Sequence, residues 1–155
     1  MFQQRLFDNS DSSESQIQVY FDGLCQPCNP GGTACFAFIV NNKEESTIHS
    51  EYGLAAYDST NNVAEYTGTI KALEWLLKNN LTNENIIARG DSRLVINQIK
   101  RHFKVKAPNI IPLYYEAKSL ISKFKYIQFE WIPRDDNKEA DRLSNLAYQK
   151  HRLGV

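Results

Sequence analysis

Long apolar runs are missing from this 155-residue chain. A transmembrane helix needs about 20 consecutive, mostly apolar residues, and no such stretch occurs, so we expect no membrane partner. No apolar segment follows Arg5 at the N-terminus, which argues against a secretory signal peptide. Together these two absences predict a cytoplasmic protein.

The chain also lacks an excess of charge of either sign. Its 18 lysine and arginine residues equal its 18 aspartate and glutamate residues, so the formal net charge is zero. Bulk charge therefore indicates no nucleic-acid partner, and such a partner has to be argued from local clusters. The candidate cluster is Lys-Arg-His-Phe-Lys-Val-Lys at residues 100–106. It is equally consistent with a solvated helix end, where the helix dipole favours cations.

Cysteine is scarce, with three residues at positions 25, 28 and 35. Cys25 and Cys28 have CxxC spacing, but no second CxxC or histidine pair supplies the remaining ligands of a zinc site. The Asn-Pro-Gly-Gly sequence after Cys28 predicts a turn rather than the helix that normally follows a redox motif. The pattern favours ordinary loop thiols, with a short-loop disulfide as the alternative.

What is present is typical of one globular domain with a hydrophobic core. The chain is 42% hydrophobic and 23% charged, which is ordinary for a globular protein of this length. Residues 8–15 are polar and acidic and predict disorder. We therefore expect a disordered leader over residues 1–15, a domain over residues 16–150 and a tail over residues 151–155. We expect a monomer.

Hydrophobic periodicity predicts five strands and four helices. The expected strands are residues 17–22, 34–40, 46–54, 86–88 and 126–132. Four helices are expected. The first follows the N-cap-rich residues 59–62, the second runs from 92 to about 103, the third starts at Pro112, and the fourth covers about 139–150. Short connections between the first three strands predict an antiparallel meander. The order β-β-β-α-β-α-α-β-α predicts an α/β domain with one five-stranded mixed sheet flanked by helices.

Four carboxylates lie at the edges of these expected elements. Asp22 ends the first strand and Asp91 the fourth, while Glu65 opens the first helix and Asp141 the last. Taken singly, an acid at such a place complements a helix dipole or caps a helix. Two strand ends and two helix starts can also meet at one rim of a sheet. Four carboxylates packed together repel one another, so such a cluster needs divalent cations.

Oxygen ligands alone select Mg²⁺ or Mn²⁺ over zinc. Two such ions about 3.5–4 Å apart clamp the attacking and leaving oxygens of an in-line phosphoryl displacement. The four acids therefore predict a site for two Mg²⁺ ions, with Mn²⁺ as a substitute. Such a site needs no nucleophile from the protein.

Several segments share their residues with one known family. They are Tyr-Phe-Asp-Gly at 20–23, Asn-Pro-Gly-Gly at 29–32, Thr-Asn-Asn-Val-Ala-Glu-Tyr at 60–66, Gly-Asp-Ser-Arg-Leu-Val at 90–95, Trp-Ile-Pro-Arg at 131–134 and, beyond Asn137, Ala-Asp-Arg-Leu at 140–143. In this order they resemble type 1 ribonuclease H over residues 16–150. The resemblance implies the ribonuclease H-like fold and Mg²⁺-dependent hydrolysis of the RNA strand of an RNA–DNA hybrid, which leaves 5′-phosphate and 3′-hydroxyl ends.

The resemblance also assigns roles to individual residues. The catalytic, metal-binding acids of the family correspond to Asp22, Glu65, Asp91 and Asp141, with Asp22 bridging both ions. The family reads RNA 2′-hydroxyl groups across the minor groove. Residues at matching substrate-binding positions are Cys25, Asn29, Thr60, Asn61, Asn62, Ser92, Arg93 and Asn137. Helix capping is an alternative role for Asn61.

Two departures from the family pattern change the expectation. Many members carry a histidine in the loop before the last acid, and residues 133–136 contain none. Arg134 is the nearest candidate for that catalytic role. It cannot shuttle a proton, but it can hold a phosphate, which predicts a lower rate or a preference for Mn²⁺. A basic protrusion is also missing, because only residues 104–108 separate the two middle helices. This short form resembles archaeal and bacterial members, some of which also cut double-stranded RNA.

Two other readings of the chain are weaker. A ribonuclease H-like module that binds nucleic acid without cutting it would be signalled by loss of one of the four acids, and none is lost. A transposase- or integrase-like enzyme of the same fold usually carries additional DNA-binding domains, for which 155 residues leave no room.

Overall fold

The computed structural model describes residues 16–155, and the expected leader, residues 1–15, lies outside the described residues. The strands are β1 (Gln16–Gln26), β2 (Gly32–Asn41), β3 (Thr47–Ser59), β4 (Asn85–Gly90) and β5 (Tyr126–Trp131). The helices are α2 (Asn61–Lys78), α3 (Arg93–Ile99), α4 (Ile111–Ile121) and α5 (Lys138–Leu153), with a short 3-10 helix η1 (Arg134–Asp136) before α5. The order of strands and α-helices is the predicted one.

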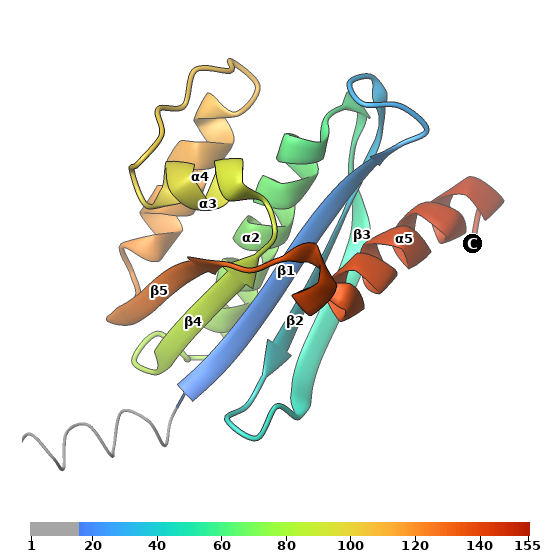
Figure 1. Ribbon diagram of the computed structural model, residues 1–155. Coiled ribbons are helices and arrows are strands. Elements are labelled where there is room, and N and C mark those ends of the chain that lie inside the picture. The colour runs from blue at the N-terminus through green and yellow to red at the C-terminus, as the bar shows by residue number, and fades with distance from the viewer. Residues whose placement is uncertain (1–15) are drawn as a thin grey trace, which may run out of the picture.

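The five strands form one mixed sheet in the order β3-β2-β1-β4-β5. The pairs β1–β2 and β2–β3 are antiparallel, and the pairs β1–β4 and β4–β5 are parallel. Helices α2, α3 and α4 lie on one side of the sheet, and α5 packs on β1, β2 and β3 from the other side (Figure 1). The predicted fold class is therefore confirmed.

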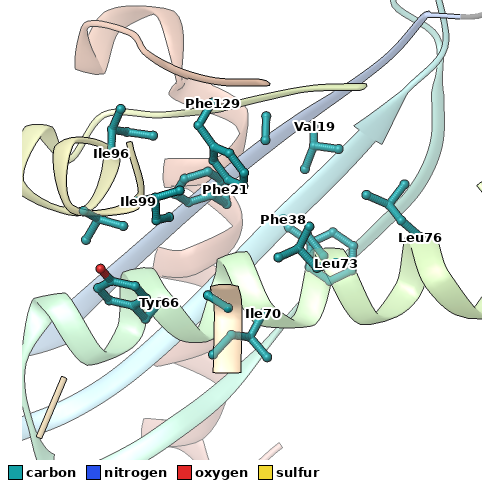
Figure 2. Packing of buried hydrophobic residues seen from close by; sticks show 14 of the residues in the cluster. Val19, Phe21, Phe38, Tyr66, Ile70, Leu73, Leu76, Ile96, Ile99 and Phe129 are labelled. Atoms are coloured by element: carbon teal, nitrogen blue, oxygen red, sulfur yellow. The ribbon is translucent and has the colours of Figure 1, made fainter. Parts of the chain in front are cut away.

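Side chains along β1 alternate between the two faces of the sheet, and both faces are packed. Val19 and Phe21 belong to the main core, where they meet Tyr66 and Leu73 of α2 (Figure 2). Tyr20, from the intervening position, packs against the smaller cluster between the sheet and α5. Because β1 is covered on both sides, Asp22 can be enclosed from both sides as well.

Strand β1 does not end at Asp22, as the sequence pattern predicted, but continues to Gln26. Its antiparallel partner β2 stays paired with it as far as Gln26↔Thr33. The parallel pairing with β4 stops earlier, at Tyr20↔Arg89. Asp22 therefore lies just beyond the point where β4 leaves β1. The sequence pattern therefore marks the place where β1 separates from β4, and not the end of β1 itself.

Three other boundaries differ from prediction by several residues. Strand β3 reaches Ser59 rather than residue 54, because it follows β2 to the pair Gly32↔Ser59. Helix α3 stops at Ile99 rather than near residue 103, and the backbone N–H groups of His102 and Phe103 donate to the carbonyl oxygen of Asn97. Helix α5 runs through residues expected in the tail and ends at the left-handed Gly154. The limits of the domain, expected at residues 16 and 150, stay a prediction.

No helix within residues 16–155 is long and apolar enough to span a membrane.

Candidate active site

Three of the four predicted acids lie together where β4 leaves β1. Asp22 comes from the middle of β1, Glu65 from α2, and Asp91 from the residue after β4. One carboxylate oxygen of each lies within 4.8 Å of those of the other two. The carboxyl end of β4 and the first turns of α2 thus bring the acids to the crevice beside β1, a common place for a ligand in a sheet that contains parallel strands.

The glycine after Asp22 permits this approach. A Cβ atom at Gly23 would lie 2.4 Å from the carbonyl carbon of Ala64 and from the backbone nitrogen of Glu65. Helix α2 therefore starts directly on the backbone of β1. The helix is capped there by Thr60, whose hydroxyl accepts a hydrogen bond from the backbone N–H of Val63 at 3.2 Å.

Asp22 is nearly enclosed, with 4% of its surface exposed. Its carboxylate accepts a hydrogen bond of 3.0 Å from the hydroxyl of Ser144 on α5. Burial, followed by the nearby charge of Asp91, raises the pKa of Asp22 to about 7. The ionised form of this carboxylate is thus less favourable than that of an exposed aspartate.

Glu65 is buried and incompletely bonded. Burial, and then the charges of Asp22 and Asp91, raise the pKa of Glu65 well above its usual range. Its Oε2 atom is buried and has no hydrogen-bond partner among the described residues. A buried carboxylate oxygen without a donor is costly unless a cation meets it. Three clustered carboxylates with such an oxygen fit a hard divalent cation.

Asp91 is held in place by a buried asparagine. Burial raises the pKa of Asp91, and the hydrogen bond from Asn137 acts in the opposite direction. The amide of Asn137 donates to Asp91 Oδ2 at 3.0 Å and to the carbonyl oxygen of Phe21 at 2.9 Å. Asn137 is only 2% exposed. Its side chain points inward and ties Asp91 to β1, and its contact with substrate stays a prediction.

We expect Asn137→Ala to lower both stability and any activity that depends on Asp91. The variant loses two hydrogen bonds and leaves the Phe21 carbonyl and a half-buried carboxylate without this donor, which costs about 1–3 kcal/mol for each group left unsatisfied. Urea unfolding monitored by circular dichroism measures the loss. The exposed Asn109→Ala, in the loop before α4, is the matched control. Equal unfolding midpoints for both variants would contradict this role.

Asp141 lies apart from the compact cluster. It stands in the first turn of α5, and its Oδ1 atom is 3.4 Å from Nη2 of Arg134. The Arg134 side chain is 78% exposed. Both residues line the same groove as the three clustered acids. The structure thus brings three acids close enough to share a cation and leaves Asp141 at the rim, paired with the arginine.

The groove above the cluster has a volume of about 520 Å³. Predicted substrate-binding residues that line it are Cys25, Asn29, Asn61, Asn62 and Ser92. The side-chain oxygen of Asn29 accepts a hydrogen bond of 3.1 Å from the backbone N–H of Asn61, which connects the loop after β1 to the start of α2. Ser92 caps α3 by accepting from the N–H of Val95 at 3.2 Å.

Thr60 and Arg93 do not line this groove, and the thiol of Cys25, which does line it, is already engaged. Thr60 is occupied as the N-cap of α2. The guanidinium group of Arg93 lies over the ring of Trp131, 4.0 Å from its centre, and Arg93 does not line the groove. The Cys25 thiol is buried and directed at the carbonyl oxygens of Cys28 and Ser59. All three cysteines are free thiols, so the disulfide alternative is not seen.

Two residues at the site were missed by the sequence analysis. Ser144 supports Asp22, and Asn145 donates to the backbone carbonyl of Asp141 at 2.9 Å and lines the groove. Both follow Asp141 by three or four positions on α5, so they share its face of the helix. This spacing was the available signal.

Comparison with known proteins agrees with this geometry. The model of the reverse transcriptase-like family matches residues 20–147. The chain therefore belongs to this family, and its domain is ribonuclease H-like, as the sequence resemblance predicted.

Individual relatives support the same assignment. The bifunctional protein Rv2228c of Mycobacterium tuberculosis is 40% identical over 119 residues, which are 77% of this chain and 32% of that protein, so the chain spans about a third of its length. Ribonuclease HI of Halobacterium salinarum is 32% identical over 132 residues, covering 85% of this chain and 64% of that protein.

Solved structures match the fold closely. The N-terminal RNase H domain of Rv2228c superposes with a TM-score of 0.81 at 32% identity, covering 90% of this chain and 98% of that one. LC11-RNase H1 in complex with an RNA/DNA hybrid gives a TM-score of 0.80 at 29% identity, covering 87% and 98% of the two chains. LC11-RNase H1 is thus a protein of this fold in complex with an RNA/DNA hybrid.

Proposed function

We propose that this protein is a metal-dependent endonuclease that hydrolyses the RNA strand of RNA–DNA hybrids and leaves 5′-phosphate products. The observation that carries the proposal is the buried cluster of Asp22, Glu65 and Asp91 at the base of a groove. The unpartnered Oε2 atom of Glu65 supports a cation there. A hybrid complex of a 29% identical structural relative supports the substrate class.

The proposal assigns a role to each of the four acids. Asp22, Glu65 and Asp91 would hold one divalent ion, and Asp22 with Asp141 would hold a second. When bound, Mg²⁺ or Mn²⁺ would generate the attacking hydroxide from water and stabilise the departing 3′-oxygen. Ser144 would keep the Asp22 carboxylate oriented, and Asn137 would do the same for Asp91.

The groove residues would read the substrate. Asn29, Asn61 and Asn62 offer amide donors and acceptors beside the acids, which suits recognition of 2′-hydroxyl groups. Such contacts do not require a DNA strand opposite the RNA, so double-stranded RNA is the second proposed substrate. A monomeric state and a cytoplasmic location stay predictions.

Arg134 is the proposed phosphate-binding residue in place of the histidine of other family members. Its exposed guanidinium group reaches Asp141 at the groove rim, where it can hold the scissile or leaving phosphate. We expect Arg134→Ala to lower kcat by about tenfold, roughly 1.4 kcal/mol of transition-state stabilisation, and to do so with Mg²⁺ and with Mn²⁺.

The matched control is Arg142→Ala, an exposed arginine on α5 that pairs with Glu139. Initial rates of hybrid cleavage in both metals compare the two variants. An unchanged rate for Arg134→Ala would remove Arg134 from the mechanism.

A cleavage assay tests the proposed function directly. A labelled RNA–DNA hybrid and a matched RNA duplex are incubated with Mg²⁺, Mn²⁺ or EDTA, using the wild-type protein and Asp91→Asn. We expect metal-dependent cuts in the RNA strand that the variant and EDTA both abolish. Binding without cleavage of either duplex would instead favour the non-catalytic module, and the RNA duplex arm decides the second substrate.

A further inference from the structure

A second groove lies beyond the C-terminal end of α3, away from the acids. It has a volume of about 540 Å³ and is formed by the loop after α3 together with α4. Its lining combines cations with aromatic rings, notably Arg101, Phe103, Lys104, Tyr114 and Tyr115. The cationic segment 100–106, which the sequence analysis left with two interpretations, thus forms one wall of this groove.

Two aromatic side chains of this groove are largely exposed. Phe103 is 50% exposed and Tyr115 is 67% exposed. The loop geometry presents Phe103 outward, because α3 ends at Ile99 and the chain turns back through Arg101, whose φ is 66°. Two large exposed rings that line the same groove indicate a binding surface, whereas single exposed rings are ordinary.

The charge of this groove is of one sign. Arg101 and Lys104 line it, and neither they nor the neighbouring Lys100 and Lys106 form an ion pair with any acid in residues 16–155. Burial and the neighbouring Arg101 lower the pKa of Lys118 on α4, which shows how closely cations gather at this end of the helix pair. Uncompensated cations beside exposed rings complement a nucleic-acid strand, which offers phosphates and base faces.

The groove and the acid cluster lie at opposite ends of α3. Ser92 caps the helix at the cluster, and Ile99 ends it at the groove. Seven helical residues rise about 10 Å, which is about three base-pair steps of a duplex. Helix α3 and the following loop lie on the same side of the sheet as α2 and α4 (Figure 1). A strand leaving the active-site groove along α3 therefore reaches this surface within a few nucleotides.

We propose that this groove binds the unpaired bases of a single-stranded extension of the hybrid held at the acid cluster. The inference rests on the proposed function for the hybrid itself. Bases within a duplex are stacked on one another and cannot offer their faces, whereas unpaired bases can stack on Phe103 and Tyr115 irrespective of sequence. Arg101 and Lys104 neutralise the phosphates of that strand. The protein would thus favour junctions between hybrid and single strand over blunt hybrids.

Fluorescence anisotropy tests this groove without cleavage. The ligands are a blunt hybrid, the same hybrid with a single-stranded DNA extension at either end, and the free single strand. They are titrated with the Asp91→Asn protein in Mg²⁺, so that no RNA is cut. We expect the extension to tighten binding about tenfold, in line with the stacking of one or two bases, and Tyr115→Ala in this background to remove most of that gain. Tyr115→Phe keeps the aromatic ring and should retain the gain in affinity.

Controls separate this inference from the proposed function. Tyr126→Ala removes a 54% exposed ring on β5 outside the groove and should change nothing. Phe103→Ala is an independent second variant, and melting temperatures verify that each protein is folded. Lys104→Gln should reduce the salt dependence of single-strand binding by about 0.7 in log–log slope, the value for one phosphate contact.

Two results would overturn the inference. An equal loss of affinity for blunt and extended hybrids would make the groove a contact for the duplex backbone. An unchanged affinity for the extension in both aromatic variants would leave the groove to another occupant, such as a protein segment. Failure of the proposed function would appear elsewhere, as absent cleavage of the blunt hybrid by the wild-type protein. Single-strand binding would still report on the groove in that case.

Discussion

Asp22→Asn is expected to abolish hybrid cleavage while raising the melting temperature of the metal-free protein at pH 8. In the folded chain the pKa of Asp22 is raised from its ordinary value of 3.8 to about 7. The folded state therefore binds more protons than the unfolded state between about pH 4 and pH 7. Stability falls as the pH rises through this window and stays low above it. The neutral amide escapes this loss.

The size of the effect has a ceiling set by the pKa difference. Values of 3.8 and about 7 correspond to about 4 kcal/mol at pH 8. Part of the gain is lost because an amide is an imperfect substitute for a carboxylate that accepts from Ser144. Thermal unfolding in EDTA at pH 5 and pH 8 measures the difference in melting temperature between Asp22→Asn and the wild type. This difference should be much smaller at pH 5.

Metal binding should also distinguish the two proteins, because the wild type should respond more strongly than the variant. Mg²⁺ or Mn²⁺ should raise the melting temperature of the wild-type protein, because an ion that binds only the folded state stabilises it. The variant should respond weakly. Asp135→Asn, at an exposed acid in η1, is the control and should resemble the wild type in both tests. A variant that is less stable than the wild type at pH 8 in EDTA would contradict the account of Asp22.

Gly23→Ala should strongly destabilise the protein by adding a single methyl group beside the site. The added Cβ would lie 2.4 Å from backbone atoms of Ala64 and Glu65. Backbone cannot move aside as the end of a flexible side chain can, so β1 and the start of α2 must separate. We expect a loss of about 3 kcal/mol or more, at the upper end of the range for overpacking. Glu65 moves with the helix, so cleavage should fall as well.

Gly53→Ala provides the matched control on β3. A Cβ there would meet only the ring of Phe36, at 3.2 Å, and a small movement of the ring accommodates it. Urea unfolding midpoints rank the wild type and the two variants. Gly23→Ala with the midpoint of the wild type would show that α2 does not rest on the β1 backbone in the way described.

The local patterns of the sequence determined the order of the elements and the identity of the acids. Alternating residues in β1 and the helical spacing after Thr60 are properties of short segments, so they are readable without the fold. The four acids were found because each stands beside such a segment and because their surroundings resemble a known family. The Asp22-Gly23 pair even indicated the crevice, since a carboxylate followed by glycine at that place has few other uses.

Only the tertiary structure decided where the strands end and which side chains meet. Strand β1 continues past Asp22 because β2, a separate segment, stays paired with it. Asn137 turns inward because its two acceptors, the Phe21 carbonyl and Asp91, come from strands far away in the sequence. Asp141 lies at the rim of the groove, where it pairs with Arg134 of the preceding η1. Hydrogen bonds and burial between distant segments depend on three-dimensional packing, which a reading of adjacent residues does not contain.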